Sequence, residues 1–316
     1  MKITVILCTY NRCGELTKAL SSVTASTVPN STEWEVLVVD NNSTDQTPAV
    51  VEEYSRRHPG RVRYLFEPRP GKSNALNTGI EKARGNILAF MDDDVTVEPM
   101  WLQNLTANLH DGTWAGAGGR ILPQWNCPRP SWLPSKDRQS LAPLAVFDLG
   151  PDAGPLAEPP FGTNMAFQKK MFDKYGIFRI DLGPRPGSLI RSEDTEFGMR
   201  LLLAGERLRY EPMAVVTHPV SPIRIQKRYF LAWWFDKARA DIREFGIPTD
   251  TKWFCAGIPL YLFRRLGVWG LRWLVSFDPS SRFSHKLKVW GKAGQILECY
   301  RLLRERNEAR ATHARI

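Results

Sequence analysis

The chain has 316 residues, of which 43% are hydrophobic and 24% are charged. This composition is globular and excludes disordered, collagen-like and coiled-coil classes. At roughly 150 residues per domain, the length predicts two domains or one large α/β domain with an appendage. The formal net charge is +10, with 24 basic and 25 acidic side chains in residues 1–218 but 19 and 8 in residues 219–316. This asymmetry predicts two parts with different partners.

Apolar and amphipathic segments alternate through the first half of the chain. Strands are expected at Ile3–Thr9, Glu35–Asn41, Val62–Phe66 and Ile87–Met91. Helices are expected at Gly14–Ser26, Thr47–Arg57, Lys72–Ala83 and Pro99–Leu109. Strand–helix alternation with nearly continuous apolar strands predicts an α/β fold, with a mostly parallel sheet covered on both faces.

The pattern weakens between Ala115 and Pro160, where nine prolines occur. They predict a loop-rich stretch that folds over a site, where Trp125 and Trp132 either stack on a sugar or pack within the loop. Regular elements return as strands at Asn164–Gln168 and Leu208–Thr217, and as helices at Lys169–Tyr175 and Asp194–Ala204. The five cysteines form no CxxC pair, which argues against a zinc site or a disulfide framework and fits a reducing compartment.

Acidic residues stand where expected strands end, which is where open α/β sheets bind ligands. Asp40 closes the second strand, Asp92–Asp94 close the fourth, and Glu193 and Asp194 open a helix. Three adjacent carboxylates repel one another unless a cation shares them, so the triplet predicts a Mg²⁺ or Mn²⁺ site facing a phosphate. The alternative is a solvated acidic turn. Neither a GxGxxG nor a GxxxxGK[ST] loop is present, which argues against dinucleotide-binding dehydrogenases and P-loop enzymes.

Six segments of residues 1–220, in this order, resemble the family 2 glycosyltransferases of the GT-A fold. They are Cys8–Arg12, Asp40–Asp45, Gly71–Gly79, Asp92–Asp94, Gly162–Asn164 and Glu193–Asp194. The resemblance implies inverting transfer of a sugar from a nucleotide-diphosphate sugar to a saccharide or lipid-linked acceptor, in cell-surface polysaccharide synthesis.

The resemblance also implies roles for individual residues. The donor nucleotide is expected to contact Thr9, Tyr10, Asn11, Arg12, Asp40, Lys72, Asp92 and Asp93. The acceptor or sugar is expected to contact Gly162, Thr163, Asn164 and Glu193. Asp194 is expected to be the general base, since a carboxylate within hydrogen-bond reach suffices to deprotonate the acceptor hydroxyl. Mn²⁺ or Mg²⁺ is expected on Asp94, with Asp92 and His218 as further ligands.

Each of these roles has a structural alternative. Asp194 also suits the first turn of a helix, where its charge favours the helix dipole. Lys72 and Arg12 also fit solvated charges at helix starts, and His218 fits a buried structural histidine. Two further functions remain open: a sugar-1-phosphate nucleotidyltransferase, which would want a glycine-rich loop with Arg after the first strand, and a non-catalytic membrane-associated nucleotide-sugar-binding protein.

The last part of the chain, residues 221–316, departs from this pattern. It is basic, contains six of the eleven tryptophans and has no nucleic-acid-binding motif. Aromatic residues interspersed with Arg and Lys predict interfacial helices on an anionic membrane, whereas the alternative is an ordinary packed helical region that binds the acceptor. The most apolar stretch, Ala256–Phe277, is interrupted by three arginines and is not expected to span a membrane. We therefore expect a GT-A domain over residues 1–220, a helical region over residues 221–316, and a cytoplasmic protein peripheral to the inner face of the cytoplasmic membrane.

Overall fold

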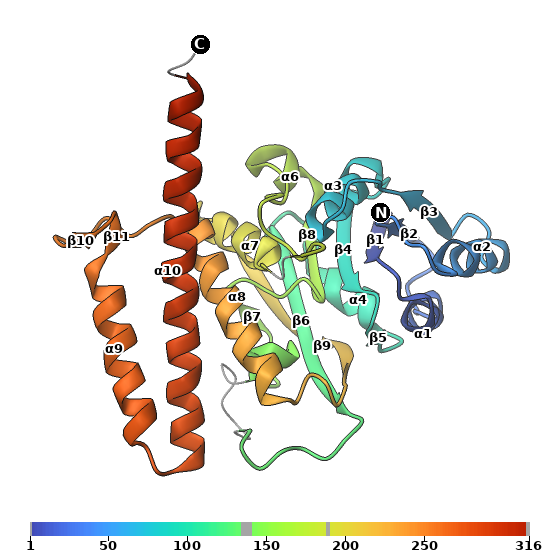
Figure 1. The fold of residues 1–316 in the computed structure, drawn as a ribbon. Coiled ribbons are helices and arrows are strands. Elements are labelled where there is room, and N and C mark those ends of the chain that lie inside the picture. The colour runs from blue at the N-terminus through green and yellow to red at the C-terminus, as the bar shows by residue number, and fades with distance from the viewer. Residues whose placement is uncertain (1, 134–140, 188–189, 314–316) are drawn as a thin grey trace. The chain divides into compact units, whose positions relative to one another are not determined.

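The computed structural model describes residues 2–133, 141–187 and 190–313, which form two compact units. The described residues of the first, the sheet unit, lie within Met1–Pro128, Ser135–Pro186 and Glu193–Ser221. Those of the second, the helical unit, lie within Arg129–Pro134, Gly187–Ser192 and Pro222–Ile316. Figure 1 shows the elements of both units in the colours of the chain order.

The sheet unit is built on one nine-stranded sheet. Its strands are β1 (Lys2–Thr9), β2 (Glu33–Asp40), β3 (Val62–Phe66), β4 (Ile87–Asp92), β5 (Thr96–Val97), β6 (Gly116–Trp125), β7 (Gly154–Pro155), β8 (Asn164–Gln168) and β9 (Leu208–Val220). The order is β3-β2-β1-β4-β8-β6-β9-β5, and β7 pairs with β9. Strands β3, β2, β1 and β4 are parallel, and β8 is antiparallel to both β4 and β6. The expected α/β fold is confirmed.

Helices cover both faces of the sheet, as the continuous apolar strands predicted. Helices α1 (Cys13–Thr24), α2 (Thr47–Arg57) and α4 (Trp101–Thr106) share one buried cluster with the side chains of Ile3, Val5 and Leu7. Helices α3 (Lys72–Lys82), α6 (Lys169–Tyr175) and α7 (Glu193–Leu203) share the other cluster with Ile6. Side chains that alternate along β1 thus enter opposite cores, because successive residues of a strand point to opposite faces. The sheet unit also contains two short 3₁₀ turns, at Ala107–Leu109 directly after α4 and at Ala142–Leu144 between β6 and β7.

Strand β6 lies inside the stretch that the sequence predicted to be loop, and that expectation was wrong for residues 116–125. The strand was not predicted because it contains glycines at positions 116, 118 and 119, and glycine has low strand propensity. A Cβ added to Gly116 would lie 2.3 Å from the ring of Phe167, and one added to Gly119 would lie 2.3 Å from the carbonyl oxygen of Ala214. Close packing therefore requires these glycines.

The register of the parallel strands gathers their carboxyl ends at one edge of the sheet. Thr9 pairs with Asp40 across β1 and β2, and Cys8 pairs with Asp92 across β1 and β4. Because parallel strands end on the same side, the residues that follow them meet there. This edge carries the predicted site residues.

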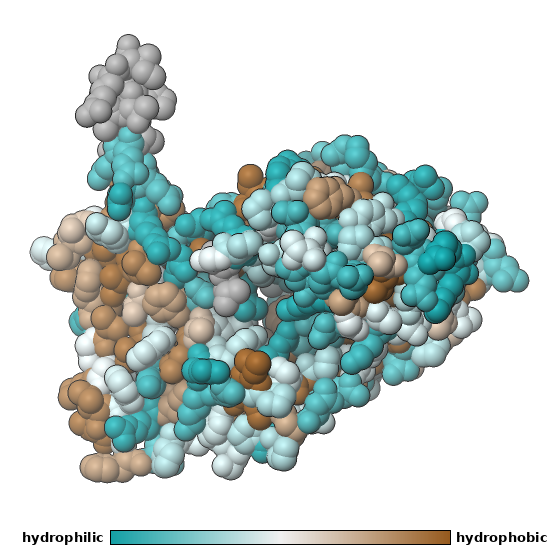
Figure 2. All heavy atoms as spheres, turned by 45° about the vertical axis from the view of Figure 1, so that its right-hand side comes forward, coloured by the Kyte–Doolittle hydropathy of each residue, from teal (hydrophilic) through white to brown (hydrophobic). Residues whose placement is uncertain are grey.

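The helical unit contains α8 (Lys227–Phe245), the hairpin β10 (Phe254–Cys255) with β11 (Ile258–Pro259), α9 (Leu260–Val275) and α10 (Pro279–His313). Its buried core includes Ile242, Ile258, Leu262 and Cys299. In this unit Trp132 packs edge-on against Phe230 and Phe283, with ring centroids 5.0 and 4.9 Å away, which favours the packing alternative for this tryptophan. Figure 2 shows brown, apolar side chains gathered at the surface near α9 and β10. Among the described residues, no helix combines the length and hydropathy needed to cross a membrane.

Candidate active site

Lys72 and Asp92 form the centre of the carboxylate cluster at the strand ends. Lys72, the first residue of α3, places its Nζ 2.5 Å from Oδ1 of Asp92 and 3.8 Å from Oε1 of Glu193. Burial disfavours the charge on Lys72, but the neighbouring carboxylates outweigh it and hold the pKa of Lys72 above its usual range. The hydroxyl of Thr163 donates to the other Asp92 oxygen at 2.7 Å. Both oxygens of Asp92 are thus engaged, and its role as a metal ligand stays a prediction.

Arg12 and Thr9 join the loop after β1 to the other two acids of the triplet. The Arg12 guanidinium lies 3.0 Å from Oδ1 of Asp93 and 3.1 Å from Oδ2 of Asp94, and the Thr9 hydroxyl donates to Asp93 at 2.8 Å. Burial raises the pKa of Asp93 to about 6, although Arg12 opposes that rise. The side chain of Arg12 is 47% exposed, so it remains accessible to an anionic ligand.

Asp94 and His218 face each other across the end of the sheet. Nε2 of His218, on β9, lies 3.5 Å from Oδ1 of Asp94, and the His218 side chain is almost fully buried. A carboxylate oxygen and an imidazole nitrogen are donors that Mn²⁺ accepts, while water and diphosphate oxygens commonly complete its coordination. The part of the chain that the structure describes has no group of three or more His, Cys, Asp or Glu side chains suited to a metal. Asp94 and His218 thus offer donor atoms of the right kind, and their role as metal ligands stays a prediction.

Asp194 occupies a separate position at the start of α7. Its Oδ2 accepts the backbone N–H of Gly162 at 2.5 Å, and its Oδ1 accepts that of Thr195 at 2.8 Å. A Cβ added to Gly162 would lie 2.9 Å from Asp194 Oδ2, so a side chain at this position would push the carboxylate away. The bonds to Gly162 and Thr195 fix the orientation of the carboxylate, as the predicted general base requires.

Glu193, next to Asp194, is buried beside Lys72. Its burial, followed by the negative charge of Asp194, raises the pKa of Glu193 to about 7. Two adjacent carboxyl groups thus differ in environment, one buried beside a cation and the other oriented by two backbone donors. Such a division of environments is typical of sites that move protons.

The loops after β1 and β2 bind each other through Asn11. Asn11 has a left-handed φ of 51°, its N–H donates to the Ser43 hydroxyl, and its side-chain oxygen accepts the N–H of Thr44. Tyr10 beside it is 48% exposed, which leaves a ring for stacking on a base. Asp40 is fully buried and accepts hydrogen bonds from the Ser43 N–H and the Tyr64 hydroxyl. These contacts give Asp40 a part in shaping the loop, and its contact with a base stays a prediction.

Asn164 lies in a buried hydrogen-bond network, and its contact with the sugar stays a prediction. It is fully buried, its amide nitrogen donates to the carbonyl oxygens of Arg120 and Ala214, and its amide oxygen accepts from Trp101 Nε1. A buried amide with these partners supports the junction of β8, β6 and β9. Thr163, one residue earlier, contacts Asp92 and joins the cluster.

Sequence reasoning missed several residues that build the site. The amide of Asn41 links the chain after β3, donating to the carbonyl oxygens of Glu67 and Arg69 and accepting the N–H of Gly71. The segment after α6 also contributes, since the Leu182 carbonyl accepts the Ser73 hydroxyl. Asn41 carried a usable signal, because it directly follows a strand end. The Leu182 contact joins residues 109 positions apart and had no local signal.

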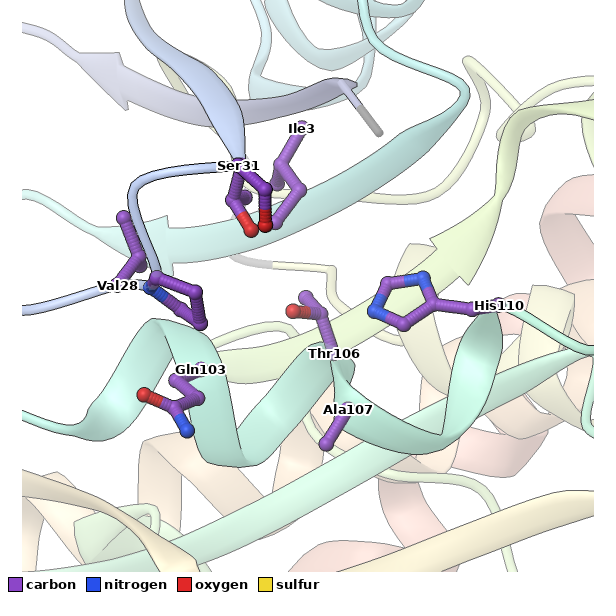
Figure 3. A pocket seen from close by; sticks show the side chains of 9 residues that line it. Ile3, Val28, Ser31, Gln103, Thr106, Ala107 and His110 are labelled. Atoms are coloured by element: carbon purple, nitrogen blue, oxygen red, sulfur yellow. The ribbon is translucent and has the colours of Figure 1, made fainter.

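A surface hollow lies at the opposite end of β1 from Thr9. Figure 3 shows Ile3 of β1, Val28 and Ser31 before β2, and Thr106 and His110 from α4 and the segment after it around this hollow. It contains no carboxylate and lies at the amino end of the parallel strands. The hollow is therefore separate from the cluster at the carboxyl ends.

Comparisons with known proteins identify the family. The profile described as "Glycosyl transferase family 2" matches residues 4–176. The glycosyltransferase AglE of Haloferax volcanii is 26% identical over 243 residues, which cover 74% of this chain and 75% of that protein. The succinoglycan biosynthesis protein ExoM of Rhizobium meliloti is 29% identical over 234 residues, which cover 74% of this chain and 70% of that protein.

A solved structure shows the same fold. The mannosyltransferase PcManGT of Pyrobaculum calidifontis, in complex with GDP-Man and Mn²⁺, aligns with a TM-score of 0.62 and 20% identity. The alignment covers 94% of this chain and 86% of that chain. The sheet and its flanking helices therefore form a GT-A fold, and the nucleotidyltransferase and non-catalytic alternatives give way to an enzyme that transfers sugars. The chain belongs to glycosyl transferase family 2 and is a glycosyltransferase.

Proposed function

We propose that the enzyme transfers a sugar, with inversion, from a nucleoside-diphosphate sugar to a hydroxyl of a saccharide or lipid-linked acceptor in polysaccharide biosynthesis. The observation that carries the proposal is that the strand ends present both a pair of side chains suited to a metal ion and an oriented carboxylate suited to a general base. Asp94 and His218 form one pair, while the N–H of Gly162 orients the carboxylate of Asp194. The sheet unit, up to about residue 220, supplies all of these groups.

The donor nucleotide binds along the loops after β1 and β2. The exposed ring of Tyr10 is available to stack on the base, and Arg12 and Lys72 supply positive charge beside the carboxylates. GDP-Man in the PcManGT complex shows that this fold accommodates a nucleotide-sugar. Arg12 pairs with Asp94 in this structure, so diphosphate binding draws on a cation that is already at the site.

Asp94 and His218 would hold a Mn²⁺ or Mg²⁺ ion, and PcManGT was crystallised with Mn²⁺. When bound, the ion supplies charge stabilisation for the departing diphosphate. Lys72 adds a second positive charge at the cluster through its contact with Asp92.

Asp194 takes the proton of the acceptor hydroxyl. The bond from the acceptor oxygen to the anomeric carbon forms as the bond to the diphosphate oxygen breaks, and the electron pair leaves with the nucleoside diphosphate. Attack on the face opposite the leaving group inverts the configuration. The N–H groups of Gly162 and Thr195 hold the carboxylate in place for this transfer. Thr163 and Glu193 lie next to this position and are proposed to bind the sugar.

The experiment is a thermal-shift and transfer screen with UDP, GDP and their sugars, with Mn²⁺ or with chelator. A ligand that binds only the native state raises the apparent stability by mass action. We expect one nucleotide to stabilise the wild type with Mn²⁺ present, and Asp94→Ala to lose transfer together with the Mn²⁺-dependent part of the affinity.

The matched control is Asp173→Ala, which removes an exposed carboxylate of α6 in the same unit. It is expected to behave as wild type. Equal nucleotide affinity of Asp94→Ala with Mn²⁺ and with chelator is the expected result. Wild-type metal dependence in that variant would contradict the assignment of Asp94.

A further inference from the structure

Helix α9 of the helical unit exposes a row of apolar side chains. Leu271, Leu274 and Val275 are 63%, 69% and 58% exposed, and Phe277, two residues past the helix, is 98% exposed. Leu260, Val268, Leu271, Leu274 and Val275 recur at helical spacing of three, four or seven to eight residues, so these five lie along one side of the helix. We call these six residues, Leu260, Val268, Leu271, Leu274, Val275 and Phe277, the α9 stripe. Figure 2 shows the brown surface in this region.

The other side of α9 packs inside the helical unit. Leu262 is fully buried in its core. Trp269 lies 5.6 Å from the ring of His285, and Trp273 lies 6.0 Å from that of Trp290, both on α10. The unit thus fills its own core without the stripe. The stripe is surface that the packing of this unit leaves exposed.

Cations lie over the tryptophan rings on the side of α9 that packs against α10. Lys288 lies 4.0 Å and Arg272 4.8 Å from the ring centroid of Trp269. Lys286 lies 5.2 Å from the centroid of Trp273 and 5.0 Å from that of Trp290. Arg264 and Arg272 of α9 are exposed, and such long basic side chains, with apolar stems and polar heads, suit the headgroup region of a bilayer.

The positive charge around the α9 stripe favours an anionic binding partner. Residues 251–297 contain eight Lys or Arg but one Asp and no Glu. A second copy docked through the same stripe would bring this positive surface against itself, and like charges at close range repel. An anionic lipid surface offers both the opposite charge and an apolar layer.

We propose that the α9 stripe inserts into the headgroup and upper acyl region of an anionic bilayer, with α9 lying in the membrane plane. The helix has 16 residues, too few to cross a bilayer. Arg264, within the stripe near its start, reaches the headgroups by extending its flexible side chain. This inference concerns the helical unit and does not depend on the proposed catalytic residues.

The test is co-sedimentation of the full chain with vesicles of phosphatidylcholine, with and without phosphatidylglycerol. The variant carries Leu271→Ser, Leu274→Ser and Phe277→Ser, all at exposed positions, and its melting curve is compared with wild type. We expect wild type to bind the anionic vesicles and the variant to bind at least about tenfold more weakly. High salt is expected to weaken wild-type binding, because it screens the Coulombic part.

The matched control carries Ile180→Ser, Leu203→Ser and Met213→Ser in the sheet unit, where these side chains are 62%, 79% and 70% exposed. It removes similar exposed apolar surface and is expected to bind like wild type. Equal binding by both variants, or no binding of wild type to anionic vesicles, overturns the proposal. A wild-type dimer that the stripe variant loses, without vesicle binding, assigns the stripe to a second copy and overturns it as well.

Discussion

Replacement of Asp194 by Asn tests the proposed base most directly. The substitution keeps the size of the side chain but removes its ability to take a proton. General-base catalysis contributes about 10²–10⁴-fold in rate, so turnover at saturating donor and acceptor should fall by that factor. At about 1.36 kcal/mol per decade, this is a barrier increase of roughly 3–5 kcal/mol. Nucleotide affinity should change little, because Asp194 bonds to Gly162 and Thr195 rather than to the donor loops.

The structure also predicts a stability cost for this variant. Each Asp194 oxygen accepts one backbone N–H. The introduced amide has only one acceptor oxygen, so its NH₂ group would face one of those donors. Loss of a hydrogen bond to a charged group costs about 1.5–3 kcal/mol. Denaturant unfolding of Asp194→Asn should show this loss, and the kinetic assay must run where the variant remains folded.

The control for this test is Glu196→Gln on the same helix. It removes the same charge from the first turn of α7, but Glu196 pairs with Arg200 one turn further along. Turnover of this variant should match wild type. Near-full turnover of folded Asp194→Asn would refute the assignment, and Glu193 would then be the next carboxyl group to test.

Two further predictions concern stability. Glu298→Gln removes the fully buried carboxylate that pairs with two arginines of α8. Unfolding by denaturant should show that the free energy of unfolding falls by about 3–5 kcal/mol. The control Glu305→Gln, at an exposed position, should change this free energy little. The Arg69 hydrogen bond lowers the pKa of Glu67 from 4.5 to about 2, so this carboxylate stabilises the fold above pH 4.5 and loses that contribution as the pH falls toward 2. Glu67→Gln should therefore lose about 1–2 kcal/mol at neutral pH, after allowance for the exposed arginine, and should depend less on pH in this range. An identical pH dependence of unfolding in wild type and Glu67→Gln would contradict the latter prediction.

The sequence alone predicted the first half of the fold and the acids of the candidate site. Strands such as Val62–Phe66 and the helix Thr47–Arg57 were placed without error, because their patterns of apolar residues are local and strong. The acids at strand ends were equally visible, since parallel strands bring their carboxyl ends to one edge. The excess of basic residues near the C-terminus was likewise evident from the sequence.

Only the tertiary structure decided which side chains meet. Strand β6 was not predicted from the sequence, because its glycines have poor strand propensity. These positions need glycine because Phe167 and Ala214, which lie far along the chain, leave no room for a Cβ. The hydrogen bonds of the Asn164 amide with Arg120, Ala214 and Trp101 were likewise not visible in the sequence. Composition gave the helical unit its charge, but packing against α10 decided which side of α9 stayed exposed, because burial depends on neighbours that local periodicity does not specify.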